Sequence, residues 1–221
     1  MTPGAARTPG TSDAPGTSDA PGTRVSADAP GTRASADAPG TRASADAPTI
    51  RRARADEAAA LADLAAATFP LACPPSSTPE DHAAFIAAHL TEGHFAAYLA
   101  DPTRDLLVAD ADGELVGYTL LVAGEPYAAE VAAAVPLRPT VELSKCYVLP
   151  GRHGGGVAGA LMAASLDAAR ARDAAGVWLG VNGENLRAQA FYRRSGFEVV
   201  GERTFQVGEQ RHHDLVLHRA L

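Results

Sequence analysis

Three consecutive glycines, Gly154, Gly155 and Gly156, stand between a strand-like run and an Ala- and Leu-rich helical run of the chain. Glycine lets the backbone approach a ligand closely, and the amides of a first helical turn point outward together at the positive end of the helix dipole. Such a turn binds anions. Because several parallel amide donors suit a phosphate or pyrophosphate, we expect a nucleotide-type cofactor at residues 154–159. The alternative is a tight turn that holds no ligand.

Two nucleotide-binding patterns can be compared with this loop. Gly154, Gly156 and Gly159 satisfy GxGxxG, but a Rossmann domain needs further strand-helix repeats after the motif, and only Glu184 offers, poorly, its ribose-binding acidic residue. A P-loop NTPase requires GK[ST] after the glycines, and the sequence lacks it there. The sequence therefore disfavours both of these protein classes.

Residues 1–48 differ in composition from the rest of the chain. They are nearly all Ala, Pro, Gly, Thr, Ser and Asp, with TSDAPG twice and then related nine-residue repeats. Such a stretch has little apolar surface to bury, so we predict a disordered tail at 1–48 and a folded domain at 49–221. The net charge is −7; the tail's four Arg and five Asp contribute −1, which leaves −6 to the domain. An acidic domain is a poor candidate for binding nucleic acid and can attract a cationic substrate.

Targeting signals and metal-binding patterns are missing from the sequence. No apolar signal segment follows the N-terminus and no apolar run reaches the length of a membrane span, so we expect a cytoplasmic protein without a membrane partner. Cys73 and Cys146 are the only cysteines and form no CxxC pair, which predicts neither a disulfide scaffold nor a structural zinc site. His82, His89 and His94 lie in a helical stretch without a third convergent ligand, so we predict no metal site.

Strands and helices alternate irregularly from residue 49 onward. Strands are expected at 49–54, at 106–124 with a hairpin turn at Asp112–Gly113, at 141–149, at 177–181 and in the last 25 residues. Helices are expected from Asp56 as N-cap, from Thr78, from Thr91, over 157–174 with Gly176 as the stop, and over 186–194 with Asn185 as N-cap. Residues 125–139 are expected to form a loop. Only the strand-helix-strand unit around the glycines is expected to be parallel. We predict an α/β fold of the mixed α+β kind, a mostly antiparallel sheet with helices on both faces.

Two motifs carry a resemblance to a known family. The segment YVLPGRHGGGVAGALM resembles the acetyl-CoA loop of the GNAT superfamily of acyl-CoA-dependent N-acyltransferases, with His153 where the family usually has Gln or Arg, then Gly156 and Ala158 at its small positions. The segment NLRAQAFYRRSGFEVVGE is similar to the family's N-x-x-A-x-x-F-Y-x-x-x-G-F, and the resemblance covers 49–221. WLGV and FQVGEQRHHDLVL resemble more narrowly the bacterial spermidine/spermine N-acetyltransferase relatives, although Asn182 and Gly183 replace a Trp-Glu pair.

The resemblance implies a GNAT fold and acetyl-CoA as co-substrate. It implies that backbone groups of one strand pair with the pantetheine arm, that amides of the glycine loop hold the pyrophosphate, and that an amine attacks the thioester directly. The cofactor-binding residues expected on this basis are Cys146, Tyr147, Val148, His153, Gly154, Gly155, Gly156, Val157, Ala158, Gly159 and Asn185.

Two side chains are expected to be catalytic. Glu142 is the expected base, because strand alternation places it on the same face as Ser144 and Cys146; a bound water can relay the proton, and the alternative is a solvated or ion-paired strand carboxylate. Tyr192, in the family's F-Y position, is implied as the general acid for the leaving thiolate; the alternative is a packing tyrosine. Cys146 as an acetyl-enzyme nucleophile is disfavoured, because no His or Asp is positioned by sequence to activate it.

Three functions remain open at the level of sequence. The first is an N-acetyltransferase that acts on the primary amine of a small molecule, with polyamines among the candidates. The second is an enzyme that acetylates a protein lysine or N-terminus, and the third is a non-catalytic acyl-CoA-binding module. A homodimer is expected from the resemblance alone, since the sequence shows no interface.

Overall fold

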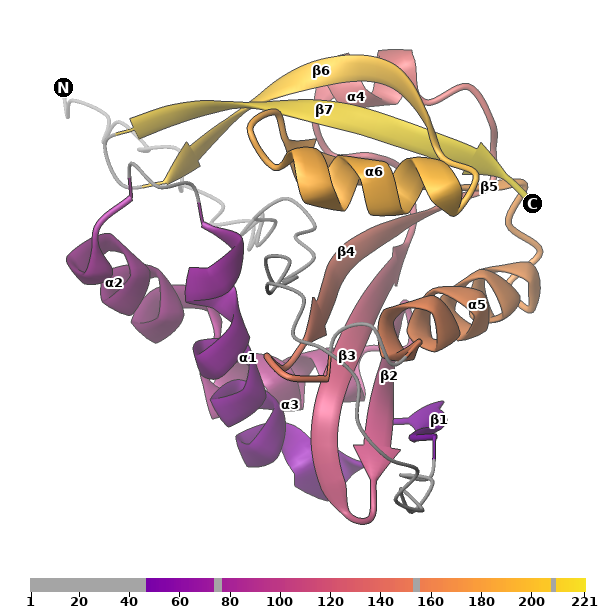
Figure 1. The fold of residues 1–221 in the computed structure, drawn as a ribbon. Coiled ribbons are helices and arrows are strands. Elements are labelled where there is room, and N and C mark those ends of the chain that lie inside the picture. Colours follow the sequence, from indigo (N-terminus) through magenta and orange to yellow (C-terminus); the bar gives the residue numbers. More distant parts are fainter. Residues whose placement is uncertain (1–46, 74–76, 153–155, 208–209) are drawn as a thin grey trace, which may run out of the picture.

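A seven-stranded mixed sheet forms the centre of the domain (Figure 1). The computed structural model describes residues 47–73, 77–152, 156–207 and 210–221. The strands lie in the order β1-β2-β3-β4-β5-β7-β6, and only β4 and β5 pair in parallel. Their bounds are β1 Thr49–Arg52, β2 Arg104–Ala111, β3 Glu114–Ala123, β4 Thr140–Val148, β5 Gly176–Asn182, β6 Glu198–Val207 and β7 Gln210–Ala220.

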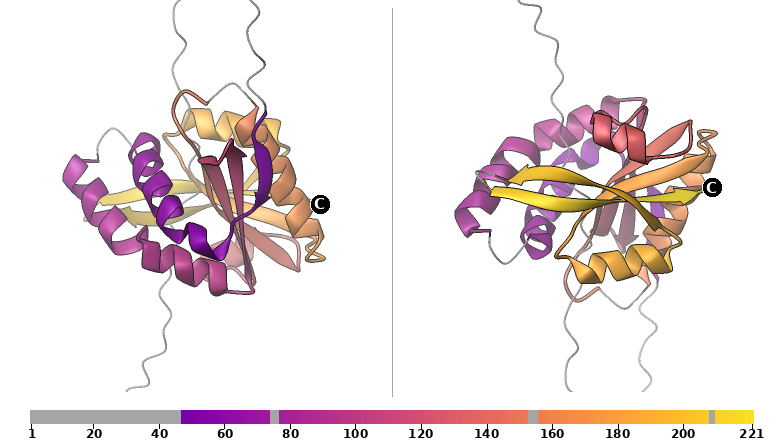
Figure 2. Two further views of the ribbon diagram at one scale, coloured as in Figure 1. Left: turned by 90° about the horizontal axis from the view of Figure 1, so that it is seen from below. Right: turned by 90° about the horizontal axis from the view of Figure 1, so that it is seen from above.

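Helices cover both faces of this sheet, which confirms the predicted fold class (Figure 2). Helices α1, α2, α3 and α4 lie on one side, while α5 and α6 lie on the other; we call these the α1–α4 face and the α5–α6 face. After a 3-10 turn at Ala55–Glu57, the helix bounds are α1 Ala58–Ala72, α2 Pro79–His89, α3 Glu92–Ala100, α4 Ala129–Ala134, α5 Val157–Arg170 and α6 Leu186–Arg194.

The two central parallel strands diverge soon after they begin. Their register contains three pairs and ends at Glu142 with Trp178. Beyond it β4 continues to Val148 and β5 to Asn182, and neither segment pairs with the other strand. We call the space between these two segments the β4–β5 opening.

A β-bulge in β4 decides which way its side chains point. Leu121 pairs with Leu143 but Leu120 pairs with Lys145, so Ser144 is an extra residue in the ladder. Side chains on directly paired residues share a face, and a bulge reverses the alternation that follows it. Glu142 therefore lies on the α1–α4 face with Lys145. The prediction that Glu142 shares a face with Cys146 is wrong, because that prediction assumed an unbroken two-residue period.

The apolar core is divided by the sheet. On the α5–α6 face, Leu143, Cys146 and Tyr192 belong to one cluster of buried side chains with residues of α5 and β5. On the α1–α4 face, Tyr118 and Tyr147 pack with side chains of α1 and α3. These clusters pack against both faces of β4. Beyond Glu142, the edge of β4 that faces β5 has no strand partner among the described residues.

Three local predictions are corrected by the structure. Asp56 does not cap α1, because it lies inside the 3-10 turn that precedes the helix. The segment 125–139, for which the sequence predicts a loop, contains helix α4. Only one side chain of this alanine-rich helix, Val131, is buried, so its sequence shows no apolar periodicity. Helix α5 ends at Arg170, and Gly176 is the first residue of β5, where a Cβ would lie 2.2 Å from Nε2 of His218.

Asp105 ties three elements of the α5–α6 face together. Its fully buried carboxylate on β2 pairs with Arg52 of β1 and, at 2.5 Å, with Nε of Arg172, which follows α5. Burial alone would raise the pKa of this carboxyl, but the two arginine hydrogen bonds outweigh it and hold the pKa below its ordinary value.

Asp105→Asn is expected to lower the free energy of unfolding by about 2 kcal/mol. Breaking a fully buried ion pair costs roughly 3–5 kcal/mol, but here Arg52 is largely exposed and can be solvated after the change. Because the folded-state pKa is depressed, the stabilisation is present above the unfolded pKa and is lost as the pH falls through the folded pKa. Urea denaturation at pH 7 and at acid pH measures both effects. An equal loss at both pH values would contradict this account.

Candidate active site

The N-terminus of α5 offers an open cradle for an anion. Gly156 is its N-cap, with a left-handed φ of 81°, and no side chain caps the helix. Apart from the adjoining backbone, no described heavy atom lies within 4 Å of a Cβ built on Gly156 or Gly159. No described side chain therefore caps the first-turn amides of Val157, Ala158 and Gly159, as a phosphate-binding turn requires. The predicted residues His153, Gly154 and Gly155 lie outside the described residues.

The free edge of β4 lies next to this cradle in the chain. Cys146, Tyr147 and Val148 pair with β3 on one edge, and the described part of β5 supplies no partner on the other. A strand edge of this kind can pair with an extended amide-bearing ligand as if with another strand. The residues present thus fit the pantetheine arm and pyrophosphate of acetyl-CoA.

Tyr192 reaches the same region from α6, on the α5–α6 face. Its ring is fully buried and makes edge contacts with Phe191 and Phe197. In the described part of the chain its hydroxyl has no hydrogen-bond partner. Burial first, then the nearby Cys146 and Tyr147, raise the pKa of Tyr192 well above its ordinary value. The phenol is therefore protonated at neutral pH and has an unused donor.

Glu142 lies on the opposite face of β4, at the last residue paired with β5. Its side chain is 7% exposed. Glu142 pairs with Val122 of β3 and Trp178 of β5, and Val122 pairs in turn with Arg104 of β2. Burial raises the pKa of Glu142 above its ordinary range, and Arg203, then Lys145 and Arg104, oppose this shift. A carboxylate with a raised pKa is a stronger base than an exposed one.

Two other predicted residues have structural roles. The side-chain oxygen of Asn185 accepts a hydrogen bond from the amide of Ala188 at 2.9 Å and caps α6. Its part in cofactor binding stays a prediction. Cys146 is fully buried, and burial raises the pKa of its thiol to about 12. Such a thiol is not a nucleophile at neutral pH, which favours direct transfer over an acetyl-enzyme.

Comparison with known proteins decides the family. The sequence matches the model of the Acetyltransferase (GNAT) family over residues 59–197. The chain belongs to this family. It is 47% identical over 161 residues to the uncharacterized N-acetyltransferase Rv2669 of Mycobacterium tuberculosis, covering 73% of this chain and 96% of that protein. It is 26% identical to an uncharacterized N-acetyltransferase of Lactobacillus delbrueckii subsp. lactis, covering 66% of this chain and 81% of the relative.

Solved structures share the GNAT fold. The PaiA N-acetyltransferase of Thermoplasma acidophilum, solved with coenzyme A, has a TM-score of 0.62 at 16% identity, covering 78% of this chain and 98% of that one. A ribosomal-protein-alanine N-acetyltransferase of Brucella melitensis has a TM-score of 0.59 at 23% identity, covering 78% and 99%. The GNAT chain described here is therefore an acetyl-CoA-dependent N-acetyltransferase.

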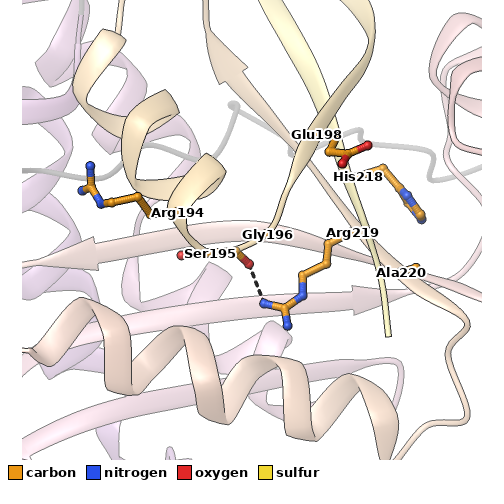
Figure 3. A pocket seen from close by; sticks show the side chains of 7 residues that line it. All are labelled: Arg194, Ser195, Gly196, Glu198, His218, Arg219 and Ala220. Carbon is orange, nitrogen blue, oxygen red and sulfur yellow. Dashed lines mark hydrogen bonds between the residues drawn. The ribbon is translucent and has the colours of Figure 1, made fainter.

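A separate pocket lies away from the β4–β5 opening of this GNAT domain (Figure 3). It has a volume of about 490 Å³ and lies at the C-terminal ends of α6 and β7. In it Nη1 of Arg219 donates a 2.5 Å hydrogen bond to the carbonyl of Ser195. Neither Tyr192 nor Glu142 lines this pocket.

Within the described residues, no group of three or more His, Cys, Asp or Glu side chains could hold a metal ion. In the same part of the chain, no helix is long and apolar enough to cross a membrane.

Arg203 is a candidate site residue that the sequence analysis missed. Its side chain crosses from β6 to β5 and lies over Gly180, where a Cβ would be 2.2 Å from Nη2. A glycine inside a strand often marks such a close approach, so the Gly of WLGV signals a close contact at this position without identifying its partner.

Gly180→Ala is expected to lower the free energy of unfolding by about 1–3 kcal/mol, because the buried guanidinium must move. The matched control is Gly159→Ala in helix α5, where a Cβ meets open space and alanine should stabilise the helix by about 0.5–1 kcal/mol. Urea denaturation of both variants measures the difference. Equal stabilities would contradict the close contact between Arg203 and Gly180.

Proposed function

We propose that this GNAT enzyme acetylates the primary amine of a small molecule by direct attack in a ternary complex. The observation that carries the proposal is the arrangement at the β4–β5 opening: Tyr192 lies on one face of the sheet and Glu142 on the other. An acid and a base are thus available on the two sides of a group held in the opening.

The residues of the opening fit the cofactor in a defined way. Acetyl-CoA, when bound, supplies the acetyl thioester. The first-turn amides of α5, from Val157 to Gly159, would hold its pyrophosphate, and the free edge of β4 from Cys146 to Val148 would pair with its pantetheine arm.

Glu142 would prepare the acceptor for attack. An alkylammonium group has a pKa of about 10.4, so removing its proton at pH 7 costs roughly 4–5 kcal/mol. A buried carboxylate on the α1–α4 face can accept that proton directly or through a water molecule. The C–N bond then forms as the C–S bond breaks, the nitrogen loses its second proton to solvent water, and Glu142 releases the first proton to solvent before the next turnover.

Tyr192 would act on the leaving sulfur. Its hydroxyl is buried and without a partner in the described residues, so a hydrogen bond to a developing thiolate replaces no existing contact. Donating its proton to that sulfur completes the transfer. The phenolate that remains is reprotonated from solvent before the next turnover.

The acceptor class is proposed from sequence resemblance. The expectation of a polyamine rests on the sequence resemblance of WLGV and the closing strands. Ribosomal-protein acetyltransferases among the structural neighbours share only the fold at 16–23% identity, so they do not favour a protein acceptor.

The test is release of free CoA thiol from acetyl-CoA with panels of small amines, amino acids, polyamines and lysine peptides, with mass spectrometry of the products. We expect acceptor-dependent release and a singly acetylated small amine. Modification of peptides alone would favour a protein acetyltransferase. No release, together with a higher melting temperature in saturating acetyl-CoA, would favour a non-catalytic binding module.

A further inference from the structure

A fixed arginine stands at the β5 edge of the opening. The guanidinium of Arg203 lies over Gly180, where a Cβ would lie 2.2, 2.5 and 2.7 Å from Nη2, Cζ and Nε. Gly180 is two residues beyond Trp178, the last β5 residue in register with β4. The positive charge therefore lies at the start of the opening, on the same face as Glu142.

Contacts on several sides hold this guanidinium in place. Nη1 donates a hydrogen bond to the hydroxyl of Tyr127 at 3.2 Å, and Cζ lies 5.9 Å from the centroid of the Trp178 ring. Nη2 is 3.5 Å from Oδ2 of Asp214, and both side chains are almost wholly buried. Asp214 belongs to β7, one strand further from β4 than Gly180. The positive end of this ion pair thus faces the opening.

Two further described cations, besides Arg203, lie on the same face of the sheet as Glu142. Lys145 of β4 and Arg104 of β2 both lie on the α1–α4 face. Nζ of Lys145 is 5.3 Å, and Cζ of Arg104 is 4.6 Å, from the centroid of the Tyr98 ring. Arg104 is paired with Asp101 at 3.0 Å, in the turn before β2. Lys145 and Arg104 thus add positive charge to the face of the sheet on which Glu142 lies.

We propose that Arg203 is a specificity-determining residue for the acceptor. Its fixed charge favours an amine that also carries an anionic group, such as a carboxylate, over an amine that carries a second ammonium group. The reason is Coulombic: a second positive charge near Arg203 is repelled, and a negative one is attracted, in a poorly hydrated site. This inference rests on the proposed function, since it requires an acceptor amine at Glu142.

Three acceptors of one length test the inference. Butylamine carries only the amine, 4-aminobutanoate adds a carboxylate, and 1,4-diaminobutane adds a second ammonium group. We expect kcat/KM to fall in the order 4-aminobutanoate, butylamine, 1,4-diaminobutane, with about a tenfold difference between the first and the last. Thiol release and product mass are measured for each at pH 7.5.

Variants assign the preference to Arg203. The double variant Arg203→Met, Asp214→Asn removes both charges of the ion pair without leaving a buried carboxylate alone, and it should reduce the tenfold difference to about twofold. The control Tyr127→Phe removes only the hydroxyl that receives the Nη1 hydrogen bond and should keep the order of the three acceptors. A ratio of kcat/KM values does not change if a variant is merely less stable.

Each outcome bears on the inference. A wild-type preference for 1,4-diaminobutane, or an unchanged tenfold difference in the double variant, would overturn it while leaving the proposed function intact. No acetylation of any of the three acceptors or of the wider amine panel would overturn the proposed function and this inference with it.

Discussion

Tyr192→Phe is expected to lower kcat by about 10²- to 10⁴-fold, because the leaving thiolate loses its proton donor. Stability should not fall, since the hydroxyl is buried and makes no hydrogen bond within the described residues, and the burial of an unpaired hydroxyl is unfavourable. Steady-state kinetics and thermal melting of the same preparation measure the two effects. KM for acetyl-CoA should change little.

Tyr118→Phe is the matched control for this variant. Tyr118 is also fully buried, its hydroxyl also has no partner in the part of the chain that the structure describes, and burial also raises its pKa. It lies on the α1–α4 face, stacked on Tyr147, away from the proposed path of the thiol. Similar losses of kcat in both variants would contradict the role of Tyr192.

Glu142→Gln is expected to lower kcat/KM for the acceptor by about 10²- to 10³-fold, because the amide cannot accept the proton of the ammonium group. In the wild type, kcat/KM should rise with pH as Glu142 ionises. Because burial raises the pKa of Glu142, this rise should occur at a higher pH than for an exposed glutamate. The glutamine variant should lack the levelling-off that follows ionisation of Glu142, and its kcat/KM should rise continuously toward the pKa of the ammonium group, about 10.4. Measurement of kcat/KM between pH 5 and 9 tests both statements.

The stability of this variant has a predicted sign. A carboxyl whose pKa is raised on folding stabilises the protein below its unfolded pKa, and that contribution is lost as the pH rises through the folded pKa. Glu142→Gln should therefore be at least as stable as the wild type at pH 8. The control is Glu114→Gln, an exposed carboxylate paired at 3.4 Å with Arg152, which should leave kcat within twofold. Strong destabilisation by Glu142→Gln would instead indicate a structural role.

The starts of helices α5 and α6 could be predicted from local sequence. A glycine N-cap, an Ala- and Leu-rich helix and the N-cap Asn185 each act within a few residues, so their signals are continuous in the chain. The same holds for Tyr192, which a family motif places on α6. The parallel pair β4 and β5 followed from the crossover helix between them.

The face of Glu142 and the position of Arg203 could not be predicted in that way. The bulge at Ser144 has no glycine or proline to mark it, yet it reverses every side chain beyond it relative to Glu142. The contact of Arg203 on β6 with Gly180 on β5 depends on the strand order β5-β7-β6, in which β7, the last strand of the sequence, lies between β5 and β6. Both features arise from strand pairing over a distance, which local patterns do not contain.

The most direct test of the central claim is a crystal structure with acetyl-CoA bound. We predict that the pantetheine arm pairs with the β4 edge at Cys146 to Val148 and that the thioester sulfur lies within hydrogen-bonding distance of the Tyr192 hydroxyl, with Glu142 facing the acetyl group from the other side of the sheet. A cofactor bound elsewhere, such as in the pocket at the C-terminal ends of α6 and β7, or a sulfur out of reach of Tyr192, would contradict it.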